Sequence, residues 1–250
     1  MSTPDGKIGP RNTTFRTIQE IVPSDDPGAP RILFFPYAGG SAYAAKVLVP
    51  ALPTGYALSA VQYPGRGPRF REGQPSTVEA IAESVLVELE PDATTILLGH
   101  SFGALVAFEA ATQLVSAGQT IRMLVVSAAR PPGFDSDAST HLLNDEEFAA
   151  IIVERGGFPP DWLANEDLMR FALPIIRADF LLAHTYRDKN ARRLPVPIVA
   201  IGGAQDSAVP PEDLGMWEGY TEQWAGLHIV PGGHFYYLTE PAQLLGAISI

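Results

Sequence analysis

Short apolar runs bounded by turn-forming residues recur along the chain from residue 31 onward. Arg31-Ile-Leu-Phe-Phe-Pro36 is apolar on consecutive positions and ends at a proline, which is typical of a strand buried on both faces of a sheet. The segment from Ala57 to Gln62 has the same character and stops at a Tyr-Pro-Gly sequence. The same pattern predicts further strands at residues 95–98, 121–127, 197–201 and 227–230.

Between these strands, apolar residues recur at helical spacing. Ser76-Thr-Val-Glu79 has the form of a capping box, and apolar positions continue at Ile81 and Val85. Residues 102–116 give a second helical pattern, which Gly118 is suited to close. Strands that alternate with helices predict an α/β fold whose mostly parallel sheet is covered by helices on both faces.

One region departs from this alternation. Between about residues 132 and 194 the patterns are helical: Asn144-Asp-Glu-Glu147 is another capping box, and Asn165-Glu-Asp167 places acidic residues at a helix start. A helical insertion of this size in an α/β fold usually forms a lid over the site. Residues 1–30 are polar with several prolines and are expected to form an extended surface arm. We therefore expect one domain over residues 1–250.

Composition narrows the class of protein. The 250 residues are 46% hydrophobic and 18% charged, an ordinary balance for a globular chain with a sizeable core. The net charge of −11 argues against a nucleic-acid partner. The chain has no cysteine, which excludes disulfides, thiolate metal sites and a cysteine nucleophile. Because no signal peptide and no apolar run of membrane-spanning length is found, we expect a cytoplasmic protein that does not contact a membrane.

The pattern Gly-His-Ser-Phe-Gly at residues 99–103 suggests a nucleophile. Ser101 lies between a predicted strand and a predicted helix, and the flanking glycines permit the tight turn that would expose its hydroxyl group. The helix start also directs backbone N–H groups at developing negative charge. Alternatively, the turn between strand and helix simply requires small residues; its position at the element boundary favours a nucleophile.

A serine nucleophile needs a base, and the chain has five histidines. His100 is expected to point away from the Ser101 hydroxyl group. His141 and His184 fall in the helical region, and His228 lies inside a strand. His234, in a Pro-Gly-Gly-His-Phe loop after the last predicted strand, is the expected base.

The acid is expected after the preceding strand, where Asp206 follows Gly-Gly-Ala-Gln. The order Ser101, Asp206, His234 is that of an α/β-hydrolase. The alternatives are Asp135 or Asp137 as the acid, with Asp206 merely starting a turn. The oxyanion hole then needs two backbone N–H groups: one from Phe102, and one from Tyr37 or Ala38 in the loop after the first core strand.

Six segments carry a resemblance beyond the fold: FFPYAGGSA (34–42), YPGRG (63–67), GHSFGA (99–104), LPIIRADF (173–180), GGAQD (202–206) and PGGHFYYL (231–238). Together they resemble the type II thioesterases, the free-standing editing hydrolases of polyketide synthases and nonribosomal peptide synthetases. The resemblance covers about residues 31–245. YPGRG and RADF are its more specific parts, since GHSxG and GGH are shared with many hydrolases.

The resemblance implies an acyl or aminoacyl group held as a thioester on the phosphopantetheine arm of a carrier protein, with water as the final acceptor. It implies a Ser-His-Asp acyl-enzyme mechanism with no cofactor and no metal. The sequence departs from many relatives at Tyr37, where histidine is common, and at Phe102, where methionine is frequent. Neither change removes a backbone N–H, so only the shape of the acyl pocket is in question. Nothing indicates an oligomer, and a monomer is the expectation.

Three arginines follow the second predicted strand: Arg66, Arg69 and Arg71. Carrier proteins are typically acidic and this chain is also acidic, so a local basic patch would help docking. The arginines are therefore candidates for contact with carrier carboxylates or the phosphate of the arm. The equally weighted alternative is an architectural loop with solvated or internally paired arginines.

In the helical region, Arg177 and Asp179 are expected to pair with each other or with neighbours to hold the lid. Five aromatic residues of the same region are candidates for lining an acyl chamber, although aromatic residues in amphipathic helices are more often plain core. They are Phe148, Phe158, Trp162, Phe171 and Phe180. Three other functions remain open: a small-molecule carboxylesterase or lipase, an acyltransferase, and a catalytically silent binding protein of the same fold.

Overall fold

The computed structural model describes residues 16–134, 139–158, 160–188 and 193–248. Within these ranges, seven strands form one sheet in the order β1-β3-β2-β4-β5-β6-β7. β1 is antiparallel to β3, and all other neighbouring strands are parallel. The strands are β1 (Ile18–Val22), β2 (Arg31–Phe35), β3 (Ala57–Val61), β4 (Thr95–His100), β5 (Met123–Ser127), β6 (Leu194–Gly203) and β7 (Thr221–Val230). This is the predicted α/β-hydrolase architecture.

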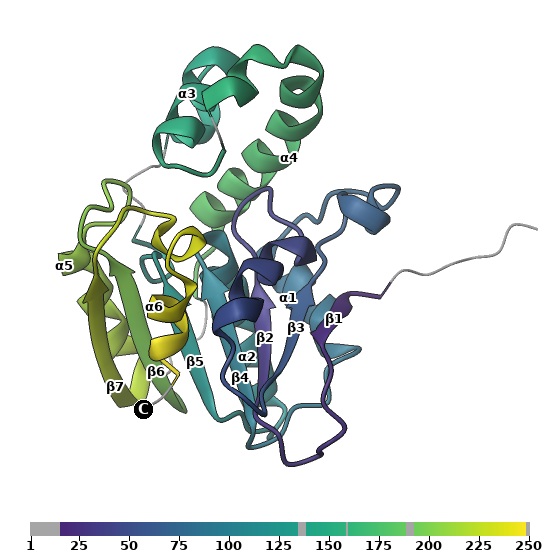
Figure 1. The fold of residues 1–250 in the computed structure, drawn as a ribbon, viewed down its shortest axis with the longest axis vertical. Coiled ribbons are helices and arrows are strands. Elements are labelled where there is room, and N and C mark those ends of the chain that lie inside the picture. Colours follow the sequence, from purple (N-terminus) through teal and green to yellow (C-terminus); the bar gives the residue numbers. More distant parts are fainter. Residues whose placement is uncertain (1–15, 135–138, 159, 189–192, 249–250) are drawn as a thin grey trace, which may run out of the picture.

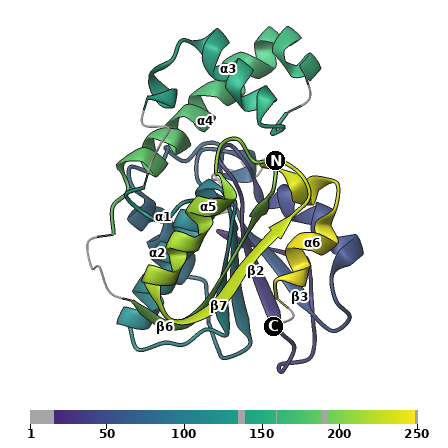
Figure 2. The same ribbon diagram turned by 90° about the vertical axis from the view of Figure 1, so that its left-hand side faces the viewer.

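Helices cover both faces of the sheet, as Figure 2 shows. Helices α1 (Val78–Leu86), α2 (Phe102–Ser116) and α5 (Pro211–Leu214) lie on one face. Helix α6 (Pro241–Gly246) and the 3-10 helix η1 (Ala42–Ala51) cover the other. No helix of the described ranges is both long enough and apolar enough to cross a membrane.

The apolar core is divided by the sheet into two layers. Adjacent residues of β2 illustrate the division, because Phe35 packs in the cluster that contains α1 and α2, whereas Phe34 packs in the cluster that contains η1 and α6. Both side chains are fully buried. Successive residues of a parallel strand therefore pack into apolar layers on opposite faces of the sheet. This explains why these strands are apolar on successive positions.

The helical region lies beyond the carboxyl ends of the strands (Figure 1). It comprises η3 (Thr140–Leu142), α3 (Asp145–Glu154), η4 (Pro160–Ala164) and α4 (Glu166–Thr185). The predicted helix starts hold: the side chain of Asn144 accepts the N–H of Glu147, and that of Asn165 accepts the N–H of Leu168. The region has a small core of its own, and the end of α4 packs against α2.

Two differences from the sequence-based predictions lie in the N-terminal half of the chain. Residues Ile18–Val22 form the edge strand β1 rather than part of a surface arm, because their backbone pairs with β3. Helix α1 is capped by Thr77, whose hydroxyl accepts the N–H of Ala80, and not by the predicted Ser76. The capping residue is therefore one position later than predicted.

Candidate active site

Ser101 lies in the turn between β4 and α2. Its backbone φ of 55° is unusual for a residue with a side chain, and strain of this kind is characteristic of a nucleophile elbow. The Ser101 N–H donates to the carbonyl of Ser127 on β5 at 2.8 Å. Helix α2 begins at the next residue, so its positive end lies beside the serine.

The glycines around Ser101 allow backbone segments to touch. A Cβ atom on Gly103 would collide with the carbonyl oxygens of Phe35 and Pro36. A Cβ atom on Gly99 would collide with the backbone at the start of α2. The end of β2, the end of β4 and the first turn of α2 are therefore packed backbone against backbone, which fixes the loop after β2 relative to Ser101.

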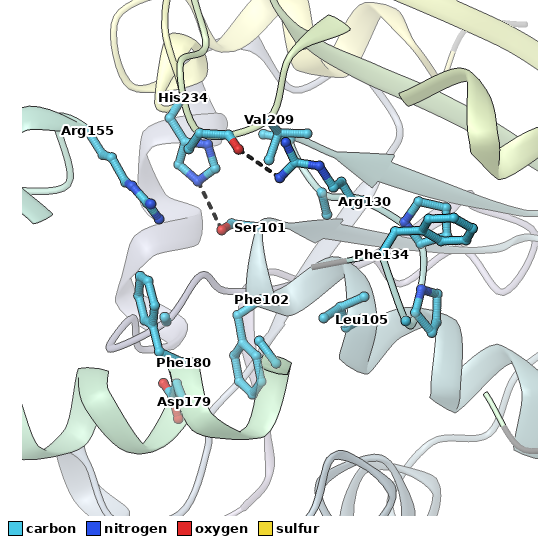
Figure 3. A pocket seen from close by; sticks show the side chains of 18 residues that line it. Ser101, Phe102, Leu105, Arg130, Phe134, Arg155, Asp179, Phe180, Val209 and His234 are labelled. Atoms are coloured by element: carbon cyan, nitrogen blue, oxygen red, sulfur yellow. Dashed lines mark hydrogen bonds between the residues drawn. The ribbon is translucent and has the colours of Figure 1, made fainter. Parts of the chain in front are cut away.

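Two further side chains, from loops at the same edge of the sheet, continue a hydrogen-bonded chain from Ser101. His234 follows β7, and its Nε2 lies 2.9 Å from Ser101 Oγ (Figure 3). Its Nδ1 lies 2.8 Å from Oδ2 of Asp206, which follows β6. With the proton on Nδ1 directed at the carboxylate, Nε2 is free to accept the serine proton. The structure thus brings together the three residues that the sequence selected.

The Asp206 carboxylate is held in its charged form. Burial raises the pKa of Asp206, but hydrogen bonds from His234 and from the backbone N–H groups of Val209 and Ala208 lower it more, so the net pKa is lowered. These N–H groups lie 3.0 and 2.9 Å from Oδ1. Asp206 therefore stays negative beside the imidazole and favours the imidazolium that proton transfer creates.

A pocket opens directly beside Ser101 and His234 (Figure 3). It has a volume of about 730 Å³, counted out to the solvent at its mouth, and runs along Phe102 and Leu105 of α2 toward Phe134. A smaller pocket of about 350 Å³ also includes Ser101 and extends toward Phe158 between α3 and α4. The two pockets thus meet at Ser101. An extended substrate could place one end in each pocket.

Ala38, Arg155 and Phe180 border both pockets, together with Ser101 and His234. Figure 3 shows the Arg155 side chain directed toward Ser101. Its guanidinium carbon lies 5.5 Å from the centre of the Phe180 ring. A cation therefore borders both pockets beside Ser101, and Arg130 and Asp179 add charged groups to the larger one.

The five aromatic candidates divide by position. Phe158 and Phe180 line pockets beside Ser101. Phe148 and Trp162 are buried in the small core of the helical region, and Phe171 is about half exposed and stacked on Phe70. Two of the five thus border the site, and three have other surroundings.

With this geometry established, comparison with known proteins decides the family. A family model described as "Thioesterase domain" matches residues 30–249. The chain belongs to the thioesterase family.

Individual relatives agree with this assignment. The chain is 36% identical to "Thioesterase PikA5" of Streptomyces venezuelae over 226 residues, which cover 88% of this chain and 80% of that protein. The solved structure of the type II thioesterase BorB from the borrelidin biosynthetic cluster superposes with a TM-score of 0.81 at 34% identity, covering 93% of this chain and 96% of that one. YbtT, a type II thioesterase from the yersiniabactin NRPS/PKS pathway, gives a TM-score of 0.83 at 25% identity with the same coverage.

Two of the three arginines predicted for carrier docking are internal in this thioesterase. Arg66 is 3% exposed and forms a two-point ion pair with Asp179, at 2.5 and 2.8 Å. Arg69 is 8% exposed and forms a two-point pair with Glu72. The docking prediction was wrong for these two guanidinium groups, because both are buried and paired inside the protein: Arg66 with the buried Asp179, and Arg69 with Glu72, Thr17 and the carbonyl of Gln62. Arg71 is exposed, and its role stays a prediction.

Arg177 and Asp179 pair with neighbours and not with each other. Arg177 donates to the carbonyls of His141 and Leu143 and pairs with Asp145, so it ties α4 to the start of α3. Asp179 instead binds Arg66 and the Gly39 N–H, in the loops after β3 and β2.

The alternative site residues lie elsewhere. Asp135 and Asp137 fall outside the described residues. His141 and His184 lie against each other in the helical region, and His228 is within β7. Among the described residues, no three His, Asp or Glu side chains are grouped as a metal ion would require.

Sequence reasoning missed a buried polar chain behind the site. His100 Nδ1 lies 2.8 Å from Ser127 Oγ, which lies 2.8 Å from the Tyr236 hydroxyl. As predicted, His100 is not bonded to Ser101; its ring packs 5.3 Å from that of His234. Burial, and then the nearby His234, hold the pKa of His100 well below its usual range. A neutral imidazole therefore backs His234, a contact that no sequence motif reveals.

Proposed function

We propose that this thioesterase hydrolyses acyl or aminoacyl thioesters from the phosphopantetheine arm of carrier proteins, as an editing enzyme of polyketide or nonribosomal peptide synthesis. One observation carries the proposal: the contiguous Ser101, His234 and Asp206 side chains open onto a pocket in a chain of the thioesterase family. The biosynthetic pathways in the names of BorB and YbtT support this class of substrate.

The first half of the proposed reaction transfers the acyl group to the enzyme. His234 Nε2 takes the Ser101 hydroxyl proton as Oγ attacks the thioester carbonyl, and Asp206 stabilises the imidazolium. The tetrahedral intermediate collapses with cleavage of the C–S bond, and the imidazolium returns its proton to the departing sulfur. The products are an acyl ester on Ser101 and the free thiol of the arm.

The second half releases the acyl group. A water molecule gives a proton to His234 and attacks the acyl ester; collapse breaks the bond to Ser101 Oγ, which recovers the proton. The products are a carboxylic acid and the resting enzyme. Oxyanion charge arises in both halves, and we assign its stabilisation to the N–H groups of Phe102 and Ala38.

Ala38 supports this assignment better than Tyr37 does. Ala38 borders both pockets with Ser101, whereas Tyr37 borders the smaller pocket only and packs its ring 4.8 Å from that of Phe235. The Tyr37 side chain therefore acts as a wall of the smaller pocket. The tyrosine in place of the more common histidine is expected to affect acyl fit and not the hydrogen bond to the oxyanion.

The proposed function is tested by comparing substrates. An acyl group on a phosphopantetheinylated carrier protein, the same acyl group on a small thiol, and its oxygen-ester analogue are incubated with the enzyme. The Ser101→Ala variant measures background hydrolysis. We expect the highest kcat/KM on the carrier. Strong oxygen-ester cleavage with little release from the carrier would instead indicate a carboxylesterase, and binding without turnover would indicate a silent binding protein.

A further inference from the structure

The loop after β2 is held by side chains from two distant segments. Residues 36–40 include Ala38, the proposed oxyanion donor. The neighbouring N–H of Gly39 donates to Oδ2 of Asp179 on α4 at 2.7 Å. Arg66, from the loop after β3, pairs with both oxygens of that carboxylate and directs Nη1 at the carbonyl of Gly40 at 3.4 Å.

Other contacts tie the same loop to the end of β3. The Tyr63 hydroxyl donates to the carbonyl of Pro36 at 3.0 Å. The side-chain oxygen of Gln62 accepts the N–H of Ala42 at 3.2 Å. The backbone is therefore held on both sides of Ala38: before it at Pro36, and after it at residues 39, 40 and 42.

The Arg66–Asp179 pair is costly to bury. Asp179 is fully buried and Arg66 nearly so, and removing two charges from water can cost as much as their attraction returns. A well-packed apolar pair would often give equal stability. What an apolar pair cannot give is a fixed acceptor for the Gly39 N–H and a fixed donor for the Gly40 carbonyl.

We propose that Arg66 and Asp179 are positioning residues, which hold the loop at residues 36–40 so that the Ala38 N–H faces the tetrahedral oxygen. The inference rests on the proposed function. It explains why the two specific motifs of the sequence, YPGRG and RADF, each contribute one member of a pair 113 residues apart. It also makes the oxyanion hole depend on α4, a helix of the region that covers the site.

Loss of the pair is expected to affect kcat more than KM. Oxyanion donors act on the transition state and bind the planar thioester carbonyl weakly, so misplacing one lowers kcat and leaves KM nearly unchanged. A purely structural role for the pair would lower the melting temperature without this selectivity. Affinity for a trifluoromethyl ketone separates the two roles, because its adduct with Ser101 carries the oxyanion.

The test uses Asp179→Asn in the full-length enzyme with a small acyl thioester. We expect kcat to fall about 10²-fold, KM to change less than threefold, and the trifluoromethyl ketone Ki to rise in parallel with the loss of kcat/KM. Glu72→Gln is the matched control: it also removes a carboxylate from an arginine of the same loop, and we expect kcat and Ki to stay unchanged.

A second variant keeps the proposal testable if Asp179→Asn does not fold. Arg66→Lys keeps the charge but loses the two-point geometry, and we expect a smaller fall in kcat with the same parallel rise in Ki. Folded variants whose kcat and Ki stay within threefold of the wild type would overturn the proposal, whatever their melting temperatures. If the wild type hydrolyses no thioester, the proposed function fails. The Ki of the trifluoromethyl ketone, whose adduct with Ser101 carries the oxyanion, still tests whether Arg66 and Asp179 position the loop at residues 36–40.

Discussion

At the scale of single residues, the state of the site depends on which nitrogen of His234 carries the proton. The Asp206 carboxylate accepts only, so its 2.8 Å contact with Nδ1 places the proton there and leaves Nε2 as an acceptor. The three residues could be selected from sequence because each follows a recognisable strand. The chain from His100 through Ser127 to Tyr236 could not, because it joins three segments that only the folded sheet brings together.

Asp206→Asn tests the proton arrangement. An asparagine can direct its NH2 group at Nδ1, which moves the histidine proton to Nε2, where it can no longer accept from Ser101. We expect kcat on a small thioester to fall about 10⁴-fold at neutral pH, with the melting temperature used to confirm folding. Asp213→Asn, which alters the nearby pair with Arg130, serves as control. A loss of less than tenfold would contradict this role of the carboxylate.

His100 predicts a dependence of stability on pH. Its pKa lies well below the usual 6.5 in the fold, so it takes up a proton on unfolding as the pH falls. The stability it contributes is complete above about pH 6.5 and is lost below it. Between pH 7.5 and 5.5 this amounts to about 1 kcal/mol in the free energy of unfolding.

The measurement is urea unfolding at the two pH values for the wild type and for His100→Asn, which can retain a hydrogen bond to Ser127 but does not titrate. The variant should lose about 1 kcal/mol less than the wild type over this interval. Equal losses in the two proteins would show that His100 does not remain neutral in the fold.

At the scale of elements, long apolar or periodic segments could be predicted from the sequence. The edge strand β1 and the choice between two neighbouring capping residues could not. Residues 102–116 coincide with α2, and β2, β3 and β4 lie on their predicted apolar runs. The strands β6 and β7 begin three and six residues before their predicted runs, because their first residues are less uniformly apolar. The edge strand β1 was missed because Ile18–Val22 is short, half-buried and defined mainly by its pairing with β3. At the start of α1, Ser76 and Thr77 are both capping residues, and only the backbone turn decides between them.

The helix cap provides a matched pair of variants. Thr77→Ala removes the acceptor for the Ala80 N–H, which lies 3.0 Å from the Thr77 hydroxyl, and should lower the free energy of unfolding by about 1 kcal/mol. Ser76→Ala removes the neighbouring hydroxyl group, which does not cap the helix, and should change the free energy of unfolding by less than about 0.5 kcal/mol. Denaturant unfolding of both variants gives the comparison; a larger loss of stability for Ser76→Ala than for Thr77→Ala would show that Ser76 caps the helix.

At the scale of the whole molecule, the residues of the candidate active site lie at one end of the sheet. Ser101, Asp206, His234 and the loop at residues 36–40 all follow the carboxyl ends of strands, as α/β topology dictates. The sequence could therefore place them at one edge. It could not pair Arg66 with Asp179, because nothing in either motif identifies a partner 113 residues away.

Docking of the proposed carrier also belongs to this scale, because carrier proteins are typically acidic and this chain has a net charge of −11. We propose that the exposed Arg71, in the loop after β3, meets that partner. Arg71→Glu is expected to raise KM for the acyl carrier severalfold, with kcat and the KM for a small thioester unchanged. Arg31→Glu, at the start of β2 and the other end of the sheet, gives the same change in net charge as a control. Equal effects of the two reversals would exclude local docking at Arg71.

The central claim is that Ser101 is the nucleophile of a thioesterase, and a single comparison tests it most directly. Initial rates of acyl release from a phosphopantetheinylated carrier are measured for the wild type and for Ser101→Ala, with circular dichroism confirming that both are folded. Losing the nucleophile should lower the rate by at least about 10³-fold. A folded Ser101→Ala variant that retains a tenth or more of the wild-type rate would contradict the claim.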